Sequence, residues 1–376
     1  MGEKMSREKI KVLMLVPSLN IGSGITSYAM AYLNVLNHQS VQMDFACYFD
    51  IHPNSYAFVE SCGGNIFVLP PLKKMNEHIV ACKRILEEGR YDIVHNNTLI
   101  VTLPMMMCAR KYVGIRVLHS HNTVLGENSF KAFRNSLFLP LLKFLATDYA
   151  ACAPAAAKAL FGKKNFTFIP NVVTGKRFIF DSVRRAEVKR KMNVEDKIVI
   201  ASIGMITMRK NPFFAVDVMS HVIKRNQTVE YWWIGSGPQE KQLANYVQEK
   251  GLSDHIKLLG KRSDVADLLN GIDILFFPSV FEGLGLVGVE AQIMGIPVLA
   301  SDSIPTEMKF TNLVTFFSLK YGIEVWCEAL ETIILQNRER RSYKNEFDKS
   351  IFSDTNAGKS LEGYYRTLIE GKSKNI

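Results

Sequence analysis

The chain has 376 residues, of which 47% are hydrophobic and 22% charged, as expected for a globular protein with enough apolar side chains for two domains. No apolar run approaches the roughly 20 residues of a membrane-spanning helix, and the polar N-terminus does not resemble a secretory signal. The six cysteines lie in apolar segments without a CxxC pair. We therefore expect buried thiols in a reducing cytoplasm, without disulfides or a zinc site.

The net charge of +10 is concentrated in the first half of the chain. Residues 1–180 hold 20 of the 46 basic residues and 11 of the 36 acidic ones, which leaves 26 against 25 for the remainder. A basic half indicates an anionic partner, such as nucleic acid, an anionic lipid surface or a phosphorylated substrate. Zinc-finger spacing and RNP-like aromatic strands are absent from the sequence, so we expect no nucleic-acid partner, and the other two stay open.

Strand-like and helix-like segments alternate through the first half. An apolar strand at 9–16 precedes a glycine loop and a helix at 25–37, and further strands are expected at 41–47, 65–68, 91–94, 115–118 and 166–169. Near-continuous apolar strands separated by helices predict a parallel sheet that is covered on both faces. Residues 170–176 are rich in turn formers and are the candidate interdomain linker.

A second alternating series follows the linker. Its strands are expected at 197–203, 228–234, 256–259, 272–277, 297–300 and 313–316. We therefore predict two doubly wound, Rossmann-like α/β domains, at 1–172 and 173–354, and a C-terminal helix over 355–376 that crosses back to the first domain. Ligands of such sheets bind beyond the carboxyl ends of the strands, so we expect a cleft that both domains line.

Two groups of residues follow strand ends in the first domain. Gly22 and Gly24 lead into a helix, where the backbone can approach a phosphate, although a plain tight turn is as common. His119 and His121 end another strand, and period-2 alternation points both to the same side. One of them is a candidate catalytic or orienting group, although a single histidine is more often structural. His95 is a weaker example of the same pattern.

The strongest motif of the second domain is a pair of glutamates, Glu282 and Glu290, on either side of a glycine-rich turn. A helix is expected at 285–294, with Glu290 about two turns inside it and free N–H groups at its start. Two carboxylates and these N–H groups suit the hydroxyls and phosphates of a sugar nucleotide. A surface glutamate and a helix-packing glycine explain the spacing equally well.

Two adjacent cations, Arg209 and Lys210, follow the first strand of the second domain and precede a proline-started helix. They could neutralise a diphosphate, whereas a solvated surface pair is the commoner arrangement. Gly235 and Gly237 follow the next strand, and we expect them to serve close backbone packing.

Residues 131–145 combine cations and bulky apolar residues at helical spacing. Such a helix can lie on anionic lipid with its basic residues at headgroup level. The alternative, which we favour from the pattern alone, is a helix packed against the core with a basic rim.

Taken together, these groups resemble the retaining glycosyltransferases of family 4, which have the GT-B fold. The resemblance extends over almost the whole chain, through an ordered set of motifs: the loop at 20–24, His121-Asn122, Ile169-Pro170-Asn171, Arg209-Lys210-Asn211, Gly235-Ser236-Gly237-Pro238, the Glu282/Glu290 pair and Ser301-Asp302. The stretch 301–307 is most similar to the branch that builds bacterial capsular and exopolysaccharides.

The resemblance implies a nucleotide-sugar donor, most commonly a UDP-sugar, and a polysaccharide or lipid-linked sugar acceptor. Glu290 would hold the ribose hydroxyls, and Glu282 would face the donor sugar. Arg209 and Lys210 would neutralise the diphosphate. The remaining implied contacts are the backbone N–H groups of Gly285 and Leu286, the base pocket at Leu259, Gly260 and Lys261, the loop of Gly22 and Gly24, and His121 beside the donor sugar.

Retention would follow from front-face attack by the acceptor hydroxyl, with the leaving phosphate oxygen taking its proton. The resemblance implies no cofactor and no metal, because the cations and N–H groups stabilise the developing charge. The chain departs from the family where Met205 replaces a common arginine, where Gly22-Ser23-Gly24 replaces Gly-Gly, and where a two-glycine turn after Asp302 is missing.

Two other functions stay open: a sugar-nucleotide epimerase of the same architecture, and a non-catalytic partner subunit of a glycosyltransferase. We expect a cytoplasmic protein, and we keep peripheral attachment to the inner face of the plasma membrane as a hypothesis.

Overall fold

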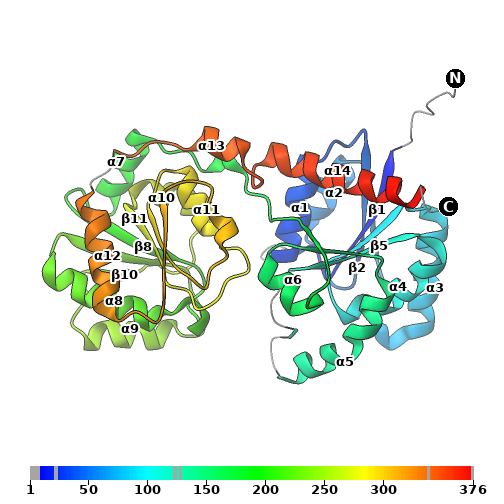
Figure 1. Ribbon diagram of the computed structural model, residues 1–376, viewed down its shortest axis with the longest axis horizontal. Helices are drawn as coiled ribbons and strands as arrows, with labels where there is room; N and C mark the ends of the chain where they lie inside the picture. Colours follow the sequence, from blue (N-terminus) through cyan, green and yellow to red (C-terminus); the bar gives the residue numbers. More distant parts are fainter. Residues whose placement is uncertain (1–8, 21–23, 122–124, 127–128, 337–338, 374–376) are drawn as a thin grey trace. The chain divides into compact units, whose positions relative to one another are not determined.

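The computed structural model describes residues 9–20, 24–121, 125–126, 129–336 and 339–373, and it divides the chain into two compact units (Figure 1). Unit 1 comprises Met1–Val172 and Asp354–Ile376, and unit 2 comprises Val173–Ser353. The first crossing between the units falls inside the segment that the sequence identifies as a linker. The second crossing falls one residue before the predicted one.

Unit 1 is a doubly wound α/β sheet (Figure 1). Within the described residues its sheet has seven strands in the order β3-β2-β1-β4-β5-β6-β7, all parallel. The strands are β1 (Ile10–Val16), β2 (Val41–Cys47), β3 (Ile66–Val68), β4 (Ile93–Asn96), β5 (Ile115–Ser120), β6 (Asp148–Ala151) and β7 (Thr167–Phe168). The helices are α1 (Gly24–Val35), α2 (Pro53–Ser61), α3 (Met75–Gly89), α4 (Leu103–Tyr112), α5 (Ser129–Leu145), α6 (Pro154–Phe161) and α14 (Asp354–Ser373).

The two faces of this sheet carry separate apolar cores. Along β1, Leu13 and Leu15 belong to one cluster and Val12 and Met14 to the other, because successive side chains of a strand point to opposite faces. Helices α3 to α6 cover the first face, and α1, α2 and α14 cover the second. The C-terminal helix therefore completes a core that the first 172 residues begin.

Unit 2 repeats the architecture with a sheet that, in the described part of the chain, has six parallel strands in the order β10-β9-β8-β11-β12-β13. The strands are β8 (Ile198–Ile203), β9 (Val229–Ile234), β10 (Ile256–Leu258), β11 (Ile274–Phe277), β12 (Val298–Ser301) and β13 (Val314–Phe317). The helices are α7 (Ser182–Lys191), α8 (Pro212–Arg225), α9 (Glu240–Glu249), α10 (Val265–Gly271), α11 (Leu286–Ile293), α12 (Ile323–Leu335) and α13 (Lys344–Lys349).

Local signals in the sequence explain where several helices begin. Asp181 caps α7, since its carboxylate accepts hydrogen bonds from the amides of Val183 at 2.8 Å and Arg184 at 3.1 Å. Pro212 occupies the first turn of α8. A backbone N–H at this position would have no partner within the helix, so proline loses no hydrogen bond. None of the helices in the described residues is both long and apolar enough to cross a membrane.

The structure corrects three details of the sequence reading. Strand β6 had no counterpart among the predicted strands, because its short sequence reads as the end of the preceding helix. Helix α11 begins one residue later and ends one residue earlier than expected, and Glu290 lies four residues, about one turn, after its start rather than two turns. Cys62 and Cys108 are half-buried, whereas the other four cysteines are buried and all six are free thiols.

Candidate active site

Glycines bring the strand ends of unit 2 close together at the carboxyl edge of its sheet. Gly204 follows β8 with φ 140°, and a Cβ at this position would lie 2.8 Å from Cε of Lys210. Gly235 follows β9, also with φ 140°, and a Cβ there would lie 2.2 Å from the carbonyl oxygen of Gly204. The amide of Gly235 donates to the carbonyl of Gly260 at 2.8 Å. This close packing confirms the role that the sequence predicts for Gly235.

The central feature of this edge is an ion pair between Lys210 and Glu282. Lys210 ends the 3₁₀ turn Met208–Lys210 after β8, and Glu282 lies in the loop after β11. Lys210 Nζ lies 2.7 Å from Glu282 Oε1, and the side chains are only 13% and 10% exposed. The ammonium also lies 4.9 Å from the ring centroid of Phe277. A pair this buried holds its charges in fixed positions and interacts strongly with a nearby ligand.

Hydrogen bonds between the two loops hold this pair in register. The amide of Val280 donates to the carbonyl of Arg209 at 2.9 Å, and Asn211 Nδ2 donates to the carbonyl of Pro278 at 3.3 Å. The side chain of Arg209 itself is exposed, while that of Lys210 is half-buried. The two adjacent cations therefore differ: Lys210 is fixed, and Arg209 is free to reach a ligand.

Glu290 lies on α11 in an environment that disfavours its charge. The residue is half-buried, and burial raises the pKa of its carboxyl from the ordinary 4.5 to about 7. The nearby guanidinium of Arg177, on the turn Gly175–Arg177, lowers the pKa and offsets part of this effect. Glu290 is therefore balanced between its charged and neutral forms near neutral pH.

A cluster of buried histidines lies at the carboxyl edge of the unit 1 sheet. The rings of His119 and His121 stack with centroids 4.1 Å apart, as their spacing on one side of the chain predicts. His95 Nε2 lies 3.0 Å from His119 Nδ1. Burial lowers the pKa of His95 and of His121 to about 3 and that of His119 well below its ordinary value, so the three imidazoles are neutral at physiological pH.

Two tyrosines attach this cluster to the helices that cover the sheet. Tyr365 on α14 places its hydroxyl 2.8 Å from His95 Nδ1, and Tyr28 on α1 places its hydroxyl 3.2 Å from His119 Nδ1. The histidines are therefore held from the first and the last helix of unit 1.

The hydrogen bonds of Asn97 fix the tautomer of His121. Asn97 Nδ2 donates to the carbonyls of His95 at 3.2 Å and Leu15 at 3.4 Å, which leaves Asn97 Oδ1 as an acceptor. His121 Nε2 lies 2.9 Å from that oxygen, so it carries the proton. Nδ1 of His121 then has a lone pair and can accept a hydrogen bond from a ligand hydroxyl.

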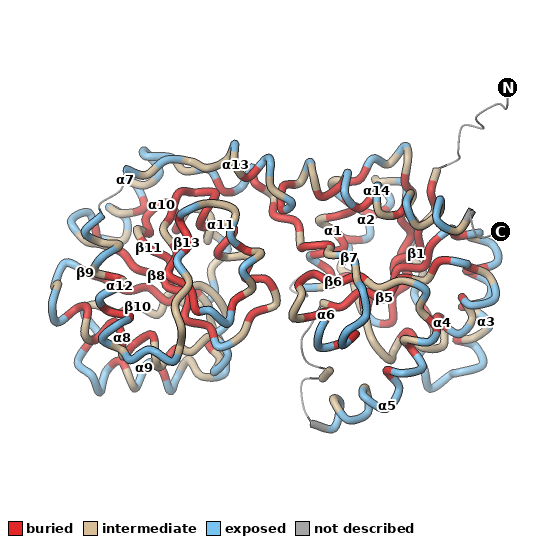
Figure 2. The backbone as a smooth tube through the Cα atoms, viewed as in Figure 1, coloured by how far each residue is buried: buried red, intermediate tan, exposed pale blue. Residues whose placement is uncertain are grey.

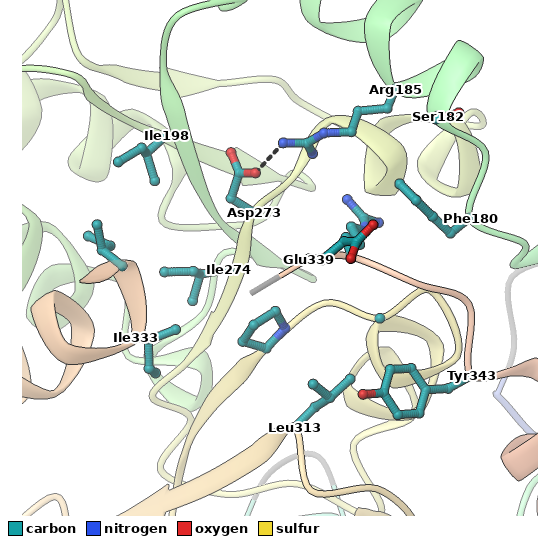
Figure 3. A pocket seen from close by; sticks show the side chains of 14 residues that line it. Phe180, Ser182, Arg185, Ile198, Asp273, Ile274, Leu313, Ile333, Glu339 and Tyr343 are labelled. Atoms are coloured by element: carbon teal, nitrogen blue, oxygen red, sulfur yellow. Dashed lines mark hydrogen bonds and ion pairs between the residues drawn. The ribbon is translucent and has the colours of Figure 1, made fainter. Parts of the chain in front are cut away.

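The opposite, amino edge of the unit 2 sheet contains a cavity of about 410 Å³ (Figure 3). Three of its charged residues, Arg185, Asp273 and Arg340, have structural roles. Arg340 donates to the carbonyls of Leu269, Asn270 and Ile272 at the end of α10, and burial lowers its pKa to about 9. Asp273 accepts hydrogen bonds from Arg185, Lys189 and the amide of Val199. These groups satisfy one another and tie α7 and α10 to the sheet.

The structure places the remaining predicted residues as follows. Gly285 precedes the first residue of α11, Leu286, where main-chain N–H groups have no partner within the helix. Leu259 and Gly260 are half-buried after β10, and Lys261 is exposed. Gly24 is the first residue of α1, while Gly22 and Asn122 lie outside the described residues.

Comparison with known proteins shows what the chain is similar to. Residues 183–349 match the family model described as "Glycosyl transferases group 1". The chain is 28% identical to the "Putative glycosyltransferase EpsF" of Bacillus subtilis (strain 168) over 356 residues, which are 91% of this chain and 92% of EpsF. It is 23% identical, over 80% of its own length and 81% of the other, to the Escherichia coli UDP-Gal:alpha-D-GlcNAc-diphosphoundecaprenol alpha-1,3-galactosyltransferase.

Solved structures show the same fold. Anabaena HepE, crystallised with UDP-glucose, aligns with a TM-score of 0.68 at 18% identity over 98% of this chain and 100% of that one. A glycosyltransferase of Rickettsia africae aligns with a TM-score of 0.74 at 14% identity over 96% and 99% of the two chains. These matches confirm the resemblance to GT-B glycosyltransferases: residues 183–349 match the group 1 family model, and the two doubly wound units have the same fold.

Several residues of this candidate site have no signal in the sequence. Arg177 lies more than a hundred positions from Glu290, directly after the segment predicted as a linker. Tyr28 and Tyr365 read as core residues of their helices, and only the packing of α1 and α14 on the same face brings them to the histidines. Asn97 is two residues after His95, but its contact with His121 spans two strands.

Proposed function

We propose that the protein is a retaining glycosyltransferase that moves a sugar from a nucleotide-sugar, a UDP-sugar in the first instance, to a lipid-linked sugar or polysaccharide acceptor. The observation that carries this proposal is the buried Lys210–Glu282 pair, Nζ–Oε1 2.7 Å, on the same sheet edge as the start of α11. The names of similar proteins support the choice of donor and acceptor, since one uses UDP-Gal and a diphosphoundecaprenol acceptor.

In the proposed mechanism, the diphosphate of the donor binds Lys210, Arg209 and the free N–H groups at Gly285 and Leu286. An ammonium has three N–H donors, so Lys210 can hold Glu282 and a phosphate oxygen at once. Charge that develops on the leaving phosphate is then stabilised by groups already in place, which is why we propose transfer without metal or cofactor.

The carboxylates of unit 2 take the hydroxyl groups of the donor. Glu290 accepts hydrogen bonds from the ribose hydroxyls. Glu282 faces the donor sugar with one carboxylate oxygen while the other oxygen pairs with Lys210. Unit 1 contributes the neutral imidazole of His121, whose Nδ1 accepts a hydrogen bond from a substrate hydroxyl. The acceptor hydroxyl attacks from the face that the leaving phosphate departs from, and the phosphate oxygen takes its proton, so the anomeric configuration is retained.

The first experiment is a thermal-shift panel of nucleotide-sugars, followed by transfer to short lipid-linked sugars. The true donor stabilises the protein by mass action, and the product of an α-linked donor has an α-linkage in its ¹H NMR spectrum. Activity that persists in EDTA supports transfer without metal. A β-linked product, or a panel in which every nucleotide-sugar leaves the melting temperature unchanged, contradicts the proposal.

Exposed aromatic residues on α5 support peripheral attachment to an anionic membrane. Phe130, Phe133 and Phe144 are 75%, 70% and 64% exposed, and together with Leu137 they form one helical stripe. Leu142, on the opposite side of the helix, is buried in the core. The arrangement favoured from the sequence, with the apolar side packed inward, is therefore wrong for most of this helix, which Figure 2 shows as largely exposed.

Vesicle binding tests this attachment. The basic residues Lys131, Arg134 and Lys143 lie on the same helix, and each cation near an anionic surface contributes about 1 kcal/mol. Replacing all three with glutamate should abolish recovery of the protein on anionic vesicles. Equal recovery of the variant and the parent protein would rule out α5 as the attachment site.

A further inference from the structure

A second binding feature of unit 1 is an apolar groove between α3 and α4. The groove has a volume of about 550 Å³, within the range of ligand sites in proteins. Met75 and Ile79 line it from α3, and Leu103, Met107 and Cys108 line it from α4. Its polar groups include two lysines, Lys83 and Lys111, one from each helix.

The two lysines lie at the same level of the groove. In a parallel sheet, α3 and α4 both run against the strand direction, so they are parallel to each other. Lys83 is eight residues beyond Met75, and Lys111 is eight residues beyond Leu103, so each lies about 12 Å along its helix. The charge of Lys83 acts on the thiol of Cys108, and Lys111 Nζ lies 5.4 Å from the ring centroid of Tyr112. Both ammonium groups therefore lie by the lining of the groove.

We propose that this groove binds one hydrocarbon chain of an anionic phospholipid, with the lipid phosphate at Lys83 and Lys111. An apolar channel with two cations at one level complements an anionic amphiphile, because the chain is removed from water while the phosphate keeps charged partners. The inference rests on the membrane attachment proposed above, and it assigns a specific lipid site beside the exposed stripe of α5.

One helix, α4, separates the groove from that stripe. Helix α4 packs against both α3 and α5, and Arg110 on α4 places its guanidinium carbon 4.9 Å from the ring centroid of Phe144 on α5. A lipid that enters the groove therefore leaves the bilayer next to the aromatic residues that we expect to lie in it.

The level of the lysines favours a membrane phospholipid over the lipid-linked acceptor. The N-termini of α3 and α4 lie at the carboxyl edge of the sheet, where His121 and Asn97 also lie, since each helix follows a strand. A phosphate at Lys83 and Lys111 is about 12 Å further along the helices. A sugar attached to that phosphate would be held away from the edge that carries the groups proposed for transfer.

Cys108 provides a native probe of occupancy. In a Cys62→Ser variant it is the one half-buried thiol of the five remaining cysteines, since the other four are buried. We would measure the rate of its alkylation by a maleimide with and without monomeric dioctanoyl phosphatidylglycerol. At ten times the dissociation constant of the lipid, protection by mass action should slow the reaction about tenfold.

Matched controls distinguish binding in the groove from a non-specific detergent effect of the lipid. Dioctanoyl phosphatidylcholine, which has no net charge, should protect much less, and a Lys83→Gln/Lys111→Gln variant should lose the protection by phosphatidylglycerol. An unchanged alkylation rate, or equal protection in the lysine variant, overturns the proposal. Protection by farnesyl phosphate alone would also overturn it, because the groove would then belong to the isoprenoid acceptor.

Failure of this proposal is distinguishable from failure of the proposed function. The thermal-shift panel on the whole protein measures donor binding. The comparison of the parent protein with the α5 variant measures vesicle attachment. A protein that binds its donor and the vesicles but shows no protection of Cys108 retains both earlier proposals and loses only the groove.

Discussion

At the scale of single residues, the site depends on charges that burial holds in place. Lys210 and Glu282 are at most 13% exposed, so their positions do not depend on flexible surface side chains. Glu290 and the histidines show the opposite effect, since burial there favours the neutral forms. Charged groups at Lys210 and Glu282 and neutral groups at the histidines thus arise from local differences in environment.

Substitution of Lys210 should mainly lower turnover. In Lys210→Ala the leaving phosphate loses a fixed cation, and loss of one such group typically lowers kcat about 10² to 10³-fold. Steady-state kinetics with a saturating donor measure the effect. Lys224→Ala removes an exposed lysine from the end of α8 and serves as the control, which should keep the parent kcat. A parent-like kcat in Lys210→Ala would contradict the assignment.

Donor affinity should depend on pH through Glu290. Its carboxyl has a pKa of about 7 in the free protein, and the ionised form is the better acceptor for two ribose hydroxyls. Binding of a nucleotide-sugar, whose diphosphate diester does not titrate in this range, should therefore tighten as the pH rises from 6 to 8. Glu290→Gln should remove this dependence and Glu290→Ala should raise the Kd, both measured by isothermal titration calorimetry.

The raised pKa of Glu290 also makes the free energy of unfolding depend on pH. The folded pKa of Glu290 lies above its ordinary value of 4.5, so the folded protein binds the proton more tightly than the unfolded chain. This stabilising contribution is fully present below about pH 4.5 and is lost as the pH rises through about 7. A Glu290→Gln variant should accordingly gain stability relative to the parent above pH 7. If the stabilities of the two proteins change with pH in parallel, the raised pKa of Glu290 is contradicted.

At the scale of elements, the carboxyl edge of unit 2 depends on two glycines whose backbones lie too close to their neighbours for a side chain. Gly204 has φ 140°, and a Cβ at this position would contact Lys210. A Cβ at Gly235 would contact the carbonyl of Gly204. The loops after β8, β9 and β10 therefore pack tightly against one another and against Lys210. A change in any of them is expected to displace that side chain.

Gly204→Ala should destabilise unit 2 and lower turnover together. The residue has a backbone conformation that costs about 1–3 kcal/mol for other amino acids, and its Cβ would lie 2.8 Å from Lys210 Cε. Thermal unfolding and kcat measure the two effects. Gly363→Ala is the control, because Gly363 lies inside α14 with open space around its Cα, and alanine there should stabilise by about 0.5–1 kcal/mol.

At the scale of the whole molecule, the chain leaves unit 1 after Val172 and returns to it at Asp354. Helix α14 then packs on the same face as α1, with Ala357, Leu361 and Tyr365 in the core. Unit 1 is therefore incomplete until the last residues of the chain are in place, although unit 2 contains its own core.

Removal of α14 by a stop after Ser353 should destabilise unit 1 selectively. The truncation exposes an apolar face and removes the Tyr365 hydroxyl from His95. All three tryptophans lie in unit 2 and are buried, so tryptophan fluorescence reports that unit alone. We expect a parent-like fluorescence transition and donor binding, with faster proteolysis of residues 1–172. Equal proteolysis of the two proteins would show that α14 is dispensable for unit 1.

The sequence by itself determined the order of strands and helices apart from β6, most strand ends within two residues, and the positions of Lys210, Glu282 and His121 at those ends. These features follow from periodicity and from residues such as glycine and proline whose backbone preferences are local. The family resemblance, which the comparisons confirm, supplied their expected roles.

Only the tertiary structure decided which side chains meet and which are desolvated. The approach of Arg177 to Glu290, the contacts of Tyr28 and Tyr365 with the histidines, and the tautomer of His121 all join distant parts of the chain. The same holds for α5, whose pattern favours a helix packed against the core although most of its apolar residues are exposed. Burial depends on what the remainder of the chain covers, and a local pattern of residues does not contain that information.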